Sequence, residues 1–108
     1  MIQIGNLKLE NNIFLAPMAG VTDITFRIIC KKAGCGLTYT EMITARGMFH
    51  KNKRTARMLE ILPEEKPVAI QLYGSEPEII AMACEKLNEN SDICLIDINM
   101  GCPNKKIV

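Results

Sequence analysis

The chain has 108 residues and a formal net charge of +1 at pH 7, and 48% of its residues are hydrophobic. This length suffices for one modest hydrophobic core, and the apolar content excludes a disordered chain. The small net charge excludes nucleic-acid binding driven by overall electrostatics, so any basic binding surface must be local.

The apolar runs and the cysteines indicate the compartment. No apolar run approaches the roughly 18 residues that a membrane helix needs, and the first ten residues lack the apolar core of a signal peptide. Five cysteines without a Cys-x-x-Cys pair predict reduced thiols and, with one histidine, no structural zinc site. We therefore expect a cytoplasmic protein without a membrane segment or a bound metal.

Hydrophobic patterns and turn residues predict alternating strands and helices. The expected elements of the first half are a β-hairpin over residues 1–11, a strand over 12–16, a helix from an N-cap at Thr22 or Asp23 to a C′ residue at Gly34, a strand over 37–40 closing on Glu41, and one or two short helices within 44–62. Those of the second half are a surface loop over 63–67, a strand over 68–73, a helix after a capping box at 75–78, a turn over 88–92 and a strand over 93–98.

Both longer helices are expected to bury one apolar stripe, because they place apolar side chains at every third or fourth position. The stripes consist of Phe26, Ile29, Cys30 and Ala33 in the first helix and Ile80, Ala83, Cys84 and Leu87 in the second. Cys30 and Cys84 are therefore expected to be core residues and not reactive thiols. Cys94, in the last strand, is expected to be buried.

The recurring strand–helix order predicts an α/β fold with a parallel sheet. The predicted strands start about 25 to 30 residues apart, as repeated βα units require. About four such units after an N-terminal hairpin fit a small doubly wound sheet. They fit equally well the N-terminal half of a (β/α)₈ TIM barrel, which needs roughly 250 residues when complete.

Small and polar residues gather where the predicted strands end. They are Pro17, Met18, Ala19 and Gly20, then Glu41, Gln71, Asn99 and Cys102. Parallel strands present their carboxyl ends at one rim, so these residues are expected to surround one pocket. Small residues let backbone N–H groups approach a flat ligand, and carboxamides suit the edge of a heteroaromatic ring. No Gly-x-Gly-x-x-Gly follows the first strand, which argues against dinucleotide binding of the Rossmann type.

Four segments together resemble the flavin-dependent tRNA-dihydrouridine synthases. They are Ala-Pro-Met-Ala-Gly-Val-Thr-Asp at 16–23, Thr-Glu-Met at 40–42, Ile-Gln-Leu-Tyr-Gly at 70–74 and Asp-Ile-Asn-Met-Gly-Cys-Pro-Asn-Lys-Lys at 97–106. The Asn-Met-Gly-Cys-Pro loop is the most specific of them. The resemblance implies part of an FMN-binding TIM barrel that reduces the C5=C6 bond of uridine in tRNA, with NADPH as the reductant.

The same resemblance implies a role for each site residue. Pro17, Met18 and Ala19 would contact FMN through their backbone, Gln71 would bond the isoalloxazine edge, Asn99 would line the catalytic face and Cys102 would be the proton donor. Glu41 remains a possible site residue. An ordinary thiol, with a pKa of about 8.5, suits the donor role because it is protonated at neutral pH yet acidic enough to protonate C5.

The resemblance also implies parts that these 108 residues do not hold: the second half of the barrel and a helical RNA-binding domain. We therefore expect residues 1–108 to be an N-terminal fragment of the barrel domain, inactive by itself and self-associating through unpaired strand edges. Two alternatives remain open: another FMN barrel oxidoreductase, akin to dihydroorotate or dihydropyrimidine dehydrogenases, and a non-catalytic half-barrel module. The basic residues between Lys51 and Arg57 form either a solvated face or a contact to RNA phosphates.

Overall fold

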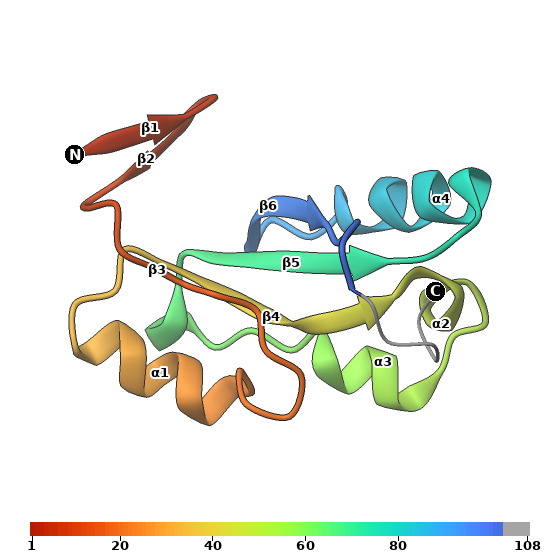
Figure 1. The fold of residues 1–108 in the computed structure, drawn as a ribbon, viewed down its shortest axis with the longest axis horizontal. Coiled ribbons are helices and arrows are strands. Elements are labelled where there is room, and N and C mark those ends of the chain that lie inside the picture. The colour runs from red at the N-terminus through yellow and green to blue at the C-terminus, as the bar shows by residue number, and fades with distance from the viewer. Residues whose placement is uncertain (103–108) are drawn as a thin grey trace.

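A computed structural model describes residues 1–102 of the chain. Its elements are β1 (Ile2–Ile4), β2 (Leu7–Leu9), β3 (Phe14–Leu15), α1 (Ile24–Lys32), β4 (Leu37–Thr44), α2 (Ala45–Phe49), α3 (Lys53–Met58), the 3₁₀ helix η1 (Pro63–Glu65), β5 (Val68–Tyr73), α4 (Pro77–Leu87) and β6 (Ile93–Ile98). Strands and helices alternate from β3 onward, which confirms the α/β class (Figure 1). None of the helices in this described part combines the length and hydropathy that crossing a bilayer requires.

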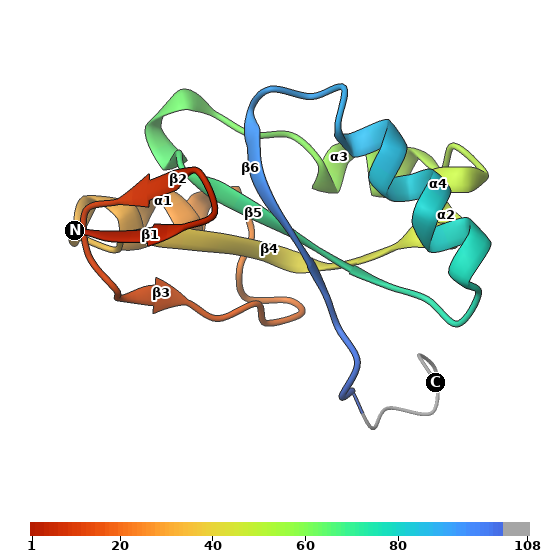
Figure 2. The ribbon, with the colours of Figure 1, turned by 90° about the horizontal axis from the view of Figure 1, so that it is seen from above.

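β3, β4, β5 and β6 form one parallel sheet in that order, so strands that follow one another in the chain also pair. Seen from above, the strand direction turns progressively from β4 to β6, as the twist of a sheet requires (Figure 2). A sequential parallel order is the order of successive βα units in a barrel. The sheet therefore fits part of a TIM barrel, and closure into a half-barrel stays a prediction.

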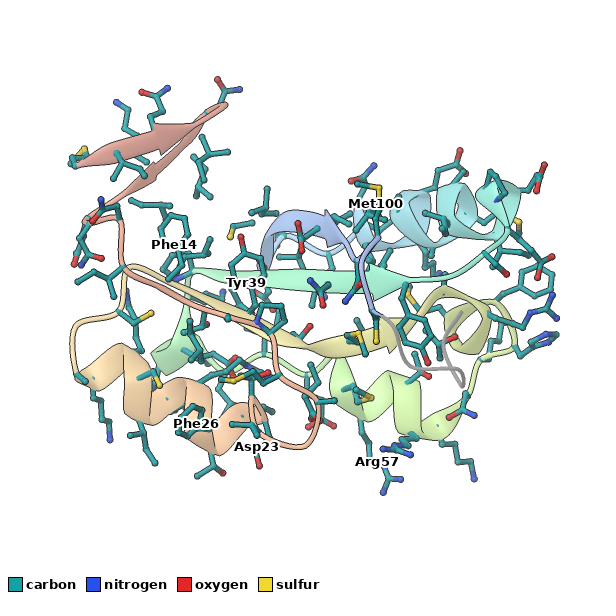
Figure 3. All side chains as sticks on the ribbon, in the orientation of Figure 1. Phe14, Asp23, Phe26, Tyr39, Arg57 and Met100 are labelled. Carbon is teal, nitrogen blue, oxygen red and sulfur yellow. The ribbon has the colours of Figure 1, made fainter. Side chains whose placement is uncertain are left out.

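The two faces of the sheet bury different side chains. On one face, α2 and α4 cover a core made of Ile43, Ala45, Ile70, Leu72, Ala83 and Leu87. On the other face, Leu9 of the hairpin packs against Leu37 and Ala69. Figure 1 shows the hairpin and α1 on opposite sides of the sheet, and Figure 3 shows Phe14 and Tyr39 on the hairpin side. Side chains alternate along a strand, so Gln71, two residues after Ala69, belongs to the hairpin face.

Several predicted boundaries are confirmed. The hairpin turns at Gly5, and two short helices, α2 and α3, fill the region between the second and third predicted strands. Asp23 caps α1, because its side chain accepts a hydrogen bond from the N–H of Phe26. Gly34 follows the C-cap of that helix with φ of +107°, a conformation that glycine adopts without strain.

The boundaries predicted for two strands are wrong. β3 covers two residues and not 12–16, since the N–H of Ile13 donates to the Asn11 side chain (2.9 Å) instead of extending a strand ladder. β4 does not stop at Thr40 but continues to Thr44, because its second half pairs with β5 beyond a bulge. Glu41 therefore lies inside a strand and not after its end.

Helix α1 buries a charged residue instead of the predicted apolar stripe. Arg27 is 2% exposed whereas Ile29 is 57% exposed. Cys30 is half-buried and belongs to neither core cluster, so its prediction as a core residue is wrong. The reason is tertiary: Arg27 Nε donates to Glu65 Oε1 at 2.5 Å, and Glu65 is fully buried in η1. The predicted surface loop at 63–67 thus contains a buried carboxylate.

The capping box predicted for α4 is wrong, but its apolar stripe is confirmed. Glu76 is the N-cap and makes no side-chain cap bond, because Pro77 occupies the first helical turn and fixes the preceding residue in an extended conformation. Ala83 and Leu87 are buried, and Cys84, which is half-buried, packs against the same core.

Cys94 in β6 is half-buried and makes the contact expected of an inert thiol. Its Sγ donates to the carbonyl of Val68 at 3.2 Å. Burial raises the pKa of the Cys94 thiol above its ordinary value, so the thiol stays protonated at neutral pH. A protonated thiol is a poor nucleophile, so these contacts indicate a structural role for Cys94.

Candidate functional site

A tight turn follows β3 and leads into α1. The carbonyl of Met18 accepts hydrogen bonds from the N–H groups of Val21 and Thr22, each at 3.0 Å. The buried Thr22 hydroxyl closes the turn, accepting from the Met18 N–H (3.2 Å) and donating to the Met18 carbonyl (3.3 Å). Gly20 has φ of +75°, so its conformation and not a shortage of space calls for glycine. Met18 and Ala19 are exposed, which leaves this turn accessible to a ligand.

Glu41 ties this turn to the sheet. Its Oε1 accepts a hydrogen bond from the Gly20 N–H at 2.5 Å. The next residue along β4, Met42, contacts the segment after β6 through its sulfur, to which Asn99 Nδ2 donates at 2.9 Å. β4 therefore links the turn to the carboxyl end of β6.

A chain of amide and carboxylate side chains spans the ends of β5 and β6. Gln71 Nε2 donates to Asp97 Oδ2 at 2.7 Å, and Gln71 Oε1 accepts from Asn99 Nδ2 at 3.3 Å. Gln71 is 6% exposed, whereas Asp97 and Asn99 are half-buried. Because a buried amide needs partners for both of its ends, this chain fixes the side chain of Gln71 in one place.

The loop that carries Cys102 is held by the same amide. Asn99 Oδ1 accepts from the N–H groups of Gly101 and Cys102, both at 3.1 Å. Asn99 is itself anchored, because its backbone N–H donates to the carbonyl of Leu72 at 2.8 Å. Cys102 is half-buried and is not part of a disulfide. Its backbone is therefore positioned by the residue that also contacts Gln71.

The structure brings some of the predicted site residues together directly and others only through β4. Gln71, Asn99 and Cys102 belong to one hydrogen-bonded chain. Within residues 1–102, no hydrogen bond joins residues 17–19 to that chain; the connection runs through Glu41 and Met42. The last residues of the Asn-Met-Gly-Cys-Pro-Asn-Lys-Lys segment lie outside the described part of the chain.

Two residues of the site were not predicted from the sequence. Asp97 contacts Gln71, and its negative charge also raises the pKa of the Tyr39 phenol, although burial is the larger cause. Two signals were available for it: it is a carboxylate inside the otherwise apolar strand 93–98, and it begins the segment at 97–106 that resembles the family. Met42 belongs to the Thr-Glu-Met segment at 40–42 that resembles the family, but no role was expected of it, since a methionine in a strand usually belongs to the core.

The described part of the chain contains no set of side chains that could bind a metal ion. Within residues 1–102, no three histidine, cysteine, aspartate or glutamate side chains cluster closely enough to hold an ion. The chemistry that the described groups offer is hydrogen bonding by two amides, and one thiol on a positioned loop.

Comparison with known proteins identifies the family. The family model described as dihydrouridine synthase matches residues 14–108. A "Probable tRNA-dihydrouridine synthase" of Rickettsia bellii is 45% identical over 109 residues, which cover 100% of this chain and 33% of that protein. The corresponding protein of Rickettsia prowazekii is 44% identical with the same coverage. A "tRNA-dihydrouridine synthase B" of Xanthomonas axonopodis is 40% identical, covering 98% of this chain and 32% of that protein.

These matches confirm the resemblance seen in the sequence motifs, and they extend well beyond them. This chain spans about a third of the length of the curated relatives that it matches. The match of the family model to nearly all of the sequence, together with identities of 40% and more, shows that the chain belongs to the dihydrouridine synthase family.

Proposed function

We propose that this chain forms the N-terminal part of the catalytic barrel of a tRNA-dihydrouridine synthase. The enzyme would reduce the C5=C6 bond of uridine in tRNA, with FMN as its cofactor and NADPH as the reductant. The observation that carries the proposal is the chain Gln71–Asn99–Cys102 at the carboxyl ends of β5 and β6, in a member of this family. In this proposal the complete enzyme contains this chain as its N-terminal part.

The described residues fit an FMN site on two counts. The turn at residues 17–20 is largely exposed, so a flat ring can approach its backbone, and Glu41 holds the turn in place. The buried Gln71 amide is fixed by two partners and keeps a second amide hydrogen for a ring edge. Bound FMN would supply the hydride to C6 of the uridine, after reduction by NADPH.

Cys102 would supply the proton that C5 requires. In this proposal the thiol gives its proton to C5 as negative charge develops there, and the thiolate is reprotonated from solvent. Asn99 contributes by holding the backbone of this loop, so that the thiol stays within reach of one face of the site. The Cys102 thiol can act only if it is held in the right place, and the Asn99 side chain holds it there. The hydrogen bond between Asn99 and the Cys102 backbone therefore supports the roles assigned to both residues.

An assay on tRNA tests this function against the two alternatives. The complete enzyme should contain flavin, detected by its visible absorbance, and should form dihydrouridine in unmodified tRNA when NADPH is added. Turnover of free dihydroorotate or dihydropyrimidines instead of tRNA would favour another FMN barrel oxidoreductase. A flavin-free protein would favour the non-catalytic module. With tRNA as the substrate and the five cysteines of this chain free, we expect the enzyme to be cytoplasmic.

The basic residues of α3 are proposed to contact tRNA phosphates. Arg54 and Arg57 line a cavity of about 370 Å³ that is also bordered by Glu41, the residue that accepts from the Gly20 N–H. Neither takes part in any of the ion pairs formed within residues 1–102. Arg54 stands in the first turn of α3, where the helix dipole disfavours a cation. Figure 3 shows Arg57 directed away from the sheet.

Neutralising these two arginines should weaken tRNA binding in a salt-dependent way. In the complete enzyme, Arg54→Gln with Arg57→Gln should reduce the slope of log K against log salt by about two, one for each arginine–phosphate pair removed. Lys8→Gln with Lys32→Gln is the matched control, since it removes two exposed cations from the hairpin and the far end of α1. Filter binding between low and moderate salt measures both slopes; equal slopes for the two variants would remove the tRNA contact from α3.

The 108-residue chain by itself is predicted to self-associate and to be inactive. β3 and β6 are the two outer strands of its sheet, and each has one edge without a neighbour in the described structure. Unpaired edges of parallel strands are ready to pair with another chain. Light scattering should therefore give a mass of at least a dimer, and a stable monomer at high concentration would contradict the prediction.

A further inference from the structure

The hydrogen-bonded chain at the ends of β5 and β6 runs in a single direction. The backbone N–H groups of Gly101 and Cys102 donate to Asn99 Oδ1. Asn99 Nδ2 donates to Gln71 Oε1 (3.3 Å), and Gln71 Nε2 donates to Asp97 Oδ2 (2.7 Å). Each amide thus receives a hydrogen bond on its oxygen and gives one from its nitrogen.

Both ends of this chain have a fixed polarity. A backbone N–H can only donate, and an ionised carboxylate can only accept. The two amides between them can each be turned by half a rotation, which exchanges oxygen and nitrogen. Turning Gln71 would place its oxygen against Asp97 and its nitrogen against the Asn99 nitrogen, so two contacts would become repulsive. Only the observed direction satisfies all the groups.

We propose that Asp97 is a positioning residue that sets the polarity of the site, so that Gln71 presents an N–H to the bound ligand and Asn99 holds the Cys102 loop. This inference rests on the proposed function and deepens it. Gln71 Nε2 carries two hydrogens, and Asp97 takes one of them. Because the amide group is anchored, the direction of its second hydrogen is fixed as well. A ligand atom that meets this hydrogen must therefore be an acceptor, such as a carbonyl oxygen or an unprotonated ring nitrogen of FMN.

The location of Asp97 supports this role over that of a surface carboxylate. It is half-buried in β6 opposite Gln71 in the strand register, and no lysine or arginine forms an ion pair with it within residues 1–102. Its side chain accepts its hydrogen bond from the Gln71 amide. A carboxylate without a cation in a partly buried strand is unfavourable unless its hydrogen bond matters, which agrees with a role in orienting that amide.

Exchanging the carboxylate of Asp97 and the amide of Gln71 distinguishes a role of Asp97 in orienting Gln71 from a role in packing alone. Gln71→Glu alone places two carboxylates against each other. Their repulsion should move the side chain at position 71 and so release Asn99. Adding Asp97→Asn restores the protein's own bonds, because the amide introduced at position 97 donates to one oxygen of the carboxylate at position 71 while Asn99 donates to the other. The double variant therefore keeps the chain as far as Asn99 and Cys102, but offers the ligand an acceptor in place of a donor.

Two measurements on the complete enzyme test the two halves of the proposal, which are that Asn99 holds the Cys102 loop and that Gln71 presents an N–H to the ligand. The rate of Cys102 alkylation by iodoacetamide, in a background with the other four cysteines of this chain and any in the rest of the enzyme replaced by alanine or serine, should rise several-fold in Gln71→Glu and return to within about twofold of the parent in the double variant. FMN affinity should stay at least about tenfold weaker in the double variant, with an altered flavin absorbance spectrum, since one hydrogen bond has become a repulsion. Asp92→Asn, an exposed aspartate just before β6, is the control and should change neither readout.

The outcomes discriminate between the two halves. Parent-like FMN affinity and spectrum in the double variant would overturn the donor role of Gln71. An alkylation rate that does not recover in the double variant would overturn the role of Asp97 in holding the loop. Failure of the parent enzyme to bind FMN would instead defeat the proposed function, while the alkylation rates would still report on the hydrogen-bonded chain.

Discussion

Cys102→Ala in the complete enzyme should abolish dihydrouridine formation while leaving FMN binding and NADPH oxidation intact. Losing a positioned proton donor slows the chemical step on the order of 10² to 10⁴-fold. Reduction of FMN by NADPH does not use this thiol in the proposed mechanism. NADPH oxidation should therefore continue, with dioxygen as the final electron acceptor. Dihydrouridine in tRNA, flavin content and NADPH consumption are the three measurements.

Cys30→Ala is the matched control for this prediction. Cys30 is a half-buried thiol on α1 that belongs to neither core cluster, so its removal should alter none of the three measurements. Dihydrouridine formation by Cys102→Ala at a rate near that of the parent enzyme would show that another group supplies the proton. Loss of flavin from the same variant would show that Cys102 acts in cofactor binding instead.

Arg27→Met should destabilise the protein strongly, although it lies in a helix that the sequence pattern describes as amphipathic. Its guanidinium bonds Glu65 and also the carbonyls of Thr22 (2.8 Å) and Glu60 (3.4 Å). Removing one partner leaves a fully buried carboxylate without its cation, which costs about 3–5 kcal/mol. The free energy of unfolding in urea measures the loss. Because Thr22 closes the turn at residues 17–22, FMN affinity should fall as well.

Arg46→Met is the control for the buried pair. Arg46 also pairs with a glutamate, Glu76, but the two side chains are 60% and 45% exposed. Exposed ion pairs contribute about 0–1 kcal/mol, so this variant should unfold nearly as the parent does. The double variant Arg27→Met with Glu65→Leu should recover part of the lost stability, since no unpaired charge remains buried. Equal losses for Arg27→Met and Arg46→Met would contradict the assigned burial energy.

The sequence predicted those parts of the site that depend on strand order and on short motifs. Because parallel strands end at one rim, Gln71 and Asn99 were expected near each other, and the structure joins them by a hydrogen bond. The roles of Pro17, Met18, Ala19 and Cys102 came from the resemblance of their motifs to the family and remain proposals. Glu41 was a possible site residue whose partner, the Gly20 N–H, no local pattern indicates.

Local patterns predicted the α/β class, the presence of one or two short helices within 44–62, the caps of α1 and the family. These features depend on neighbours within a few residues or on contiguous motifs, so the local chain carries them. Local patterns did not indicate that α1 turns Arg27 inward or that Gln71 donates a hydrogen bond to Asp97; both are properties of the tertiary structure. Each of those facts depends on a partner 26 or 38 residues away, and a side chain's periodicity does not reveal which distant charge or amide will satisfy it.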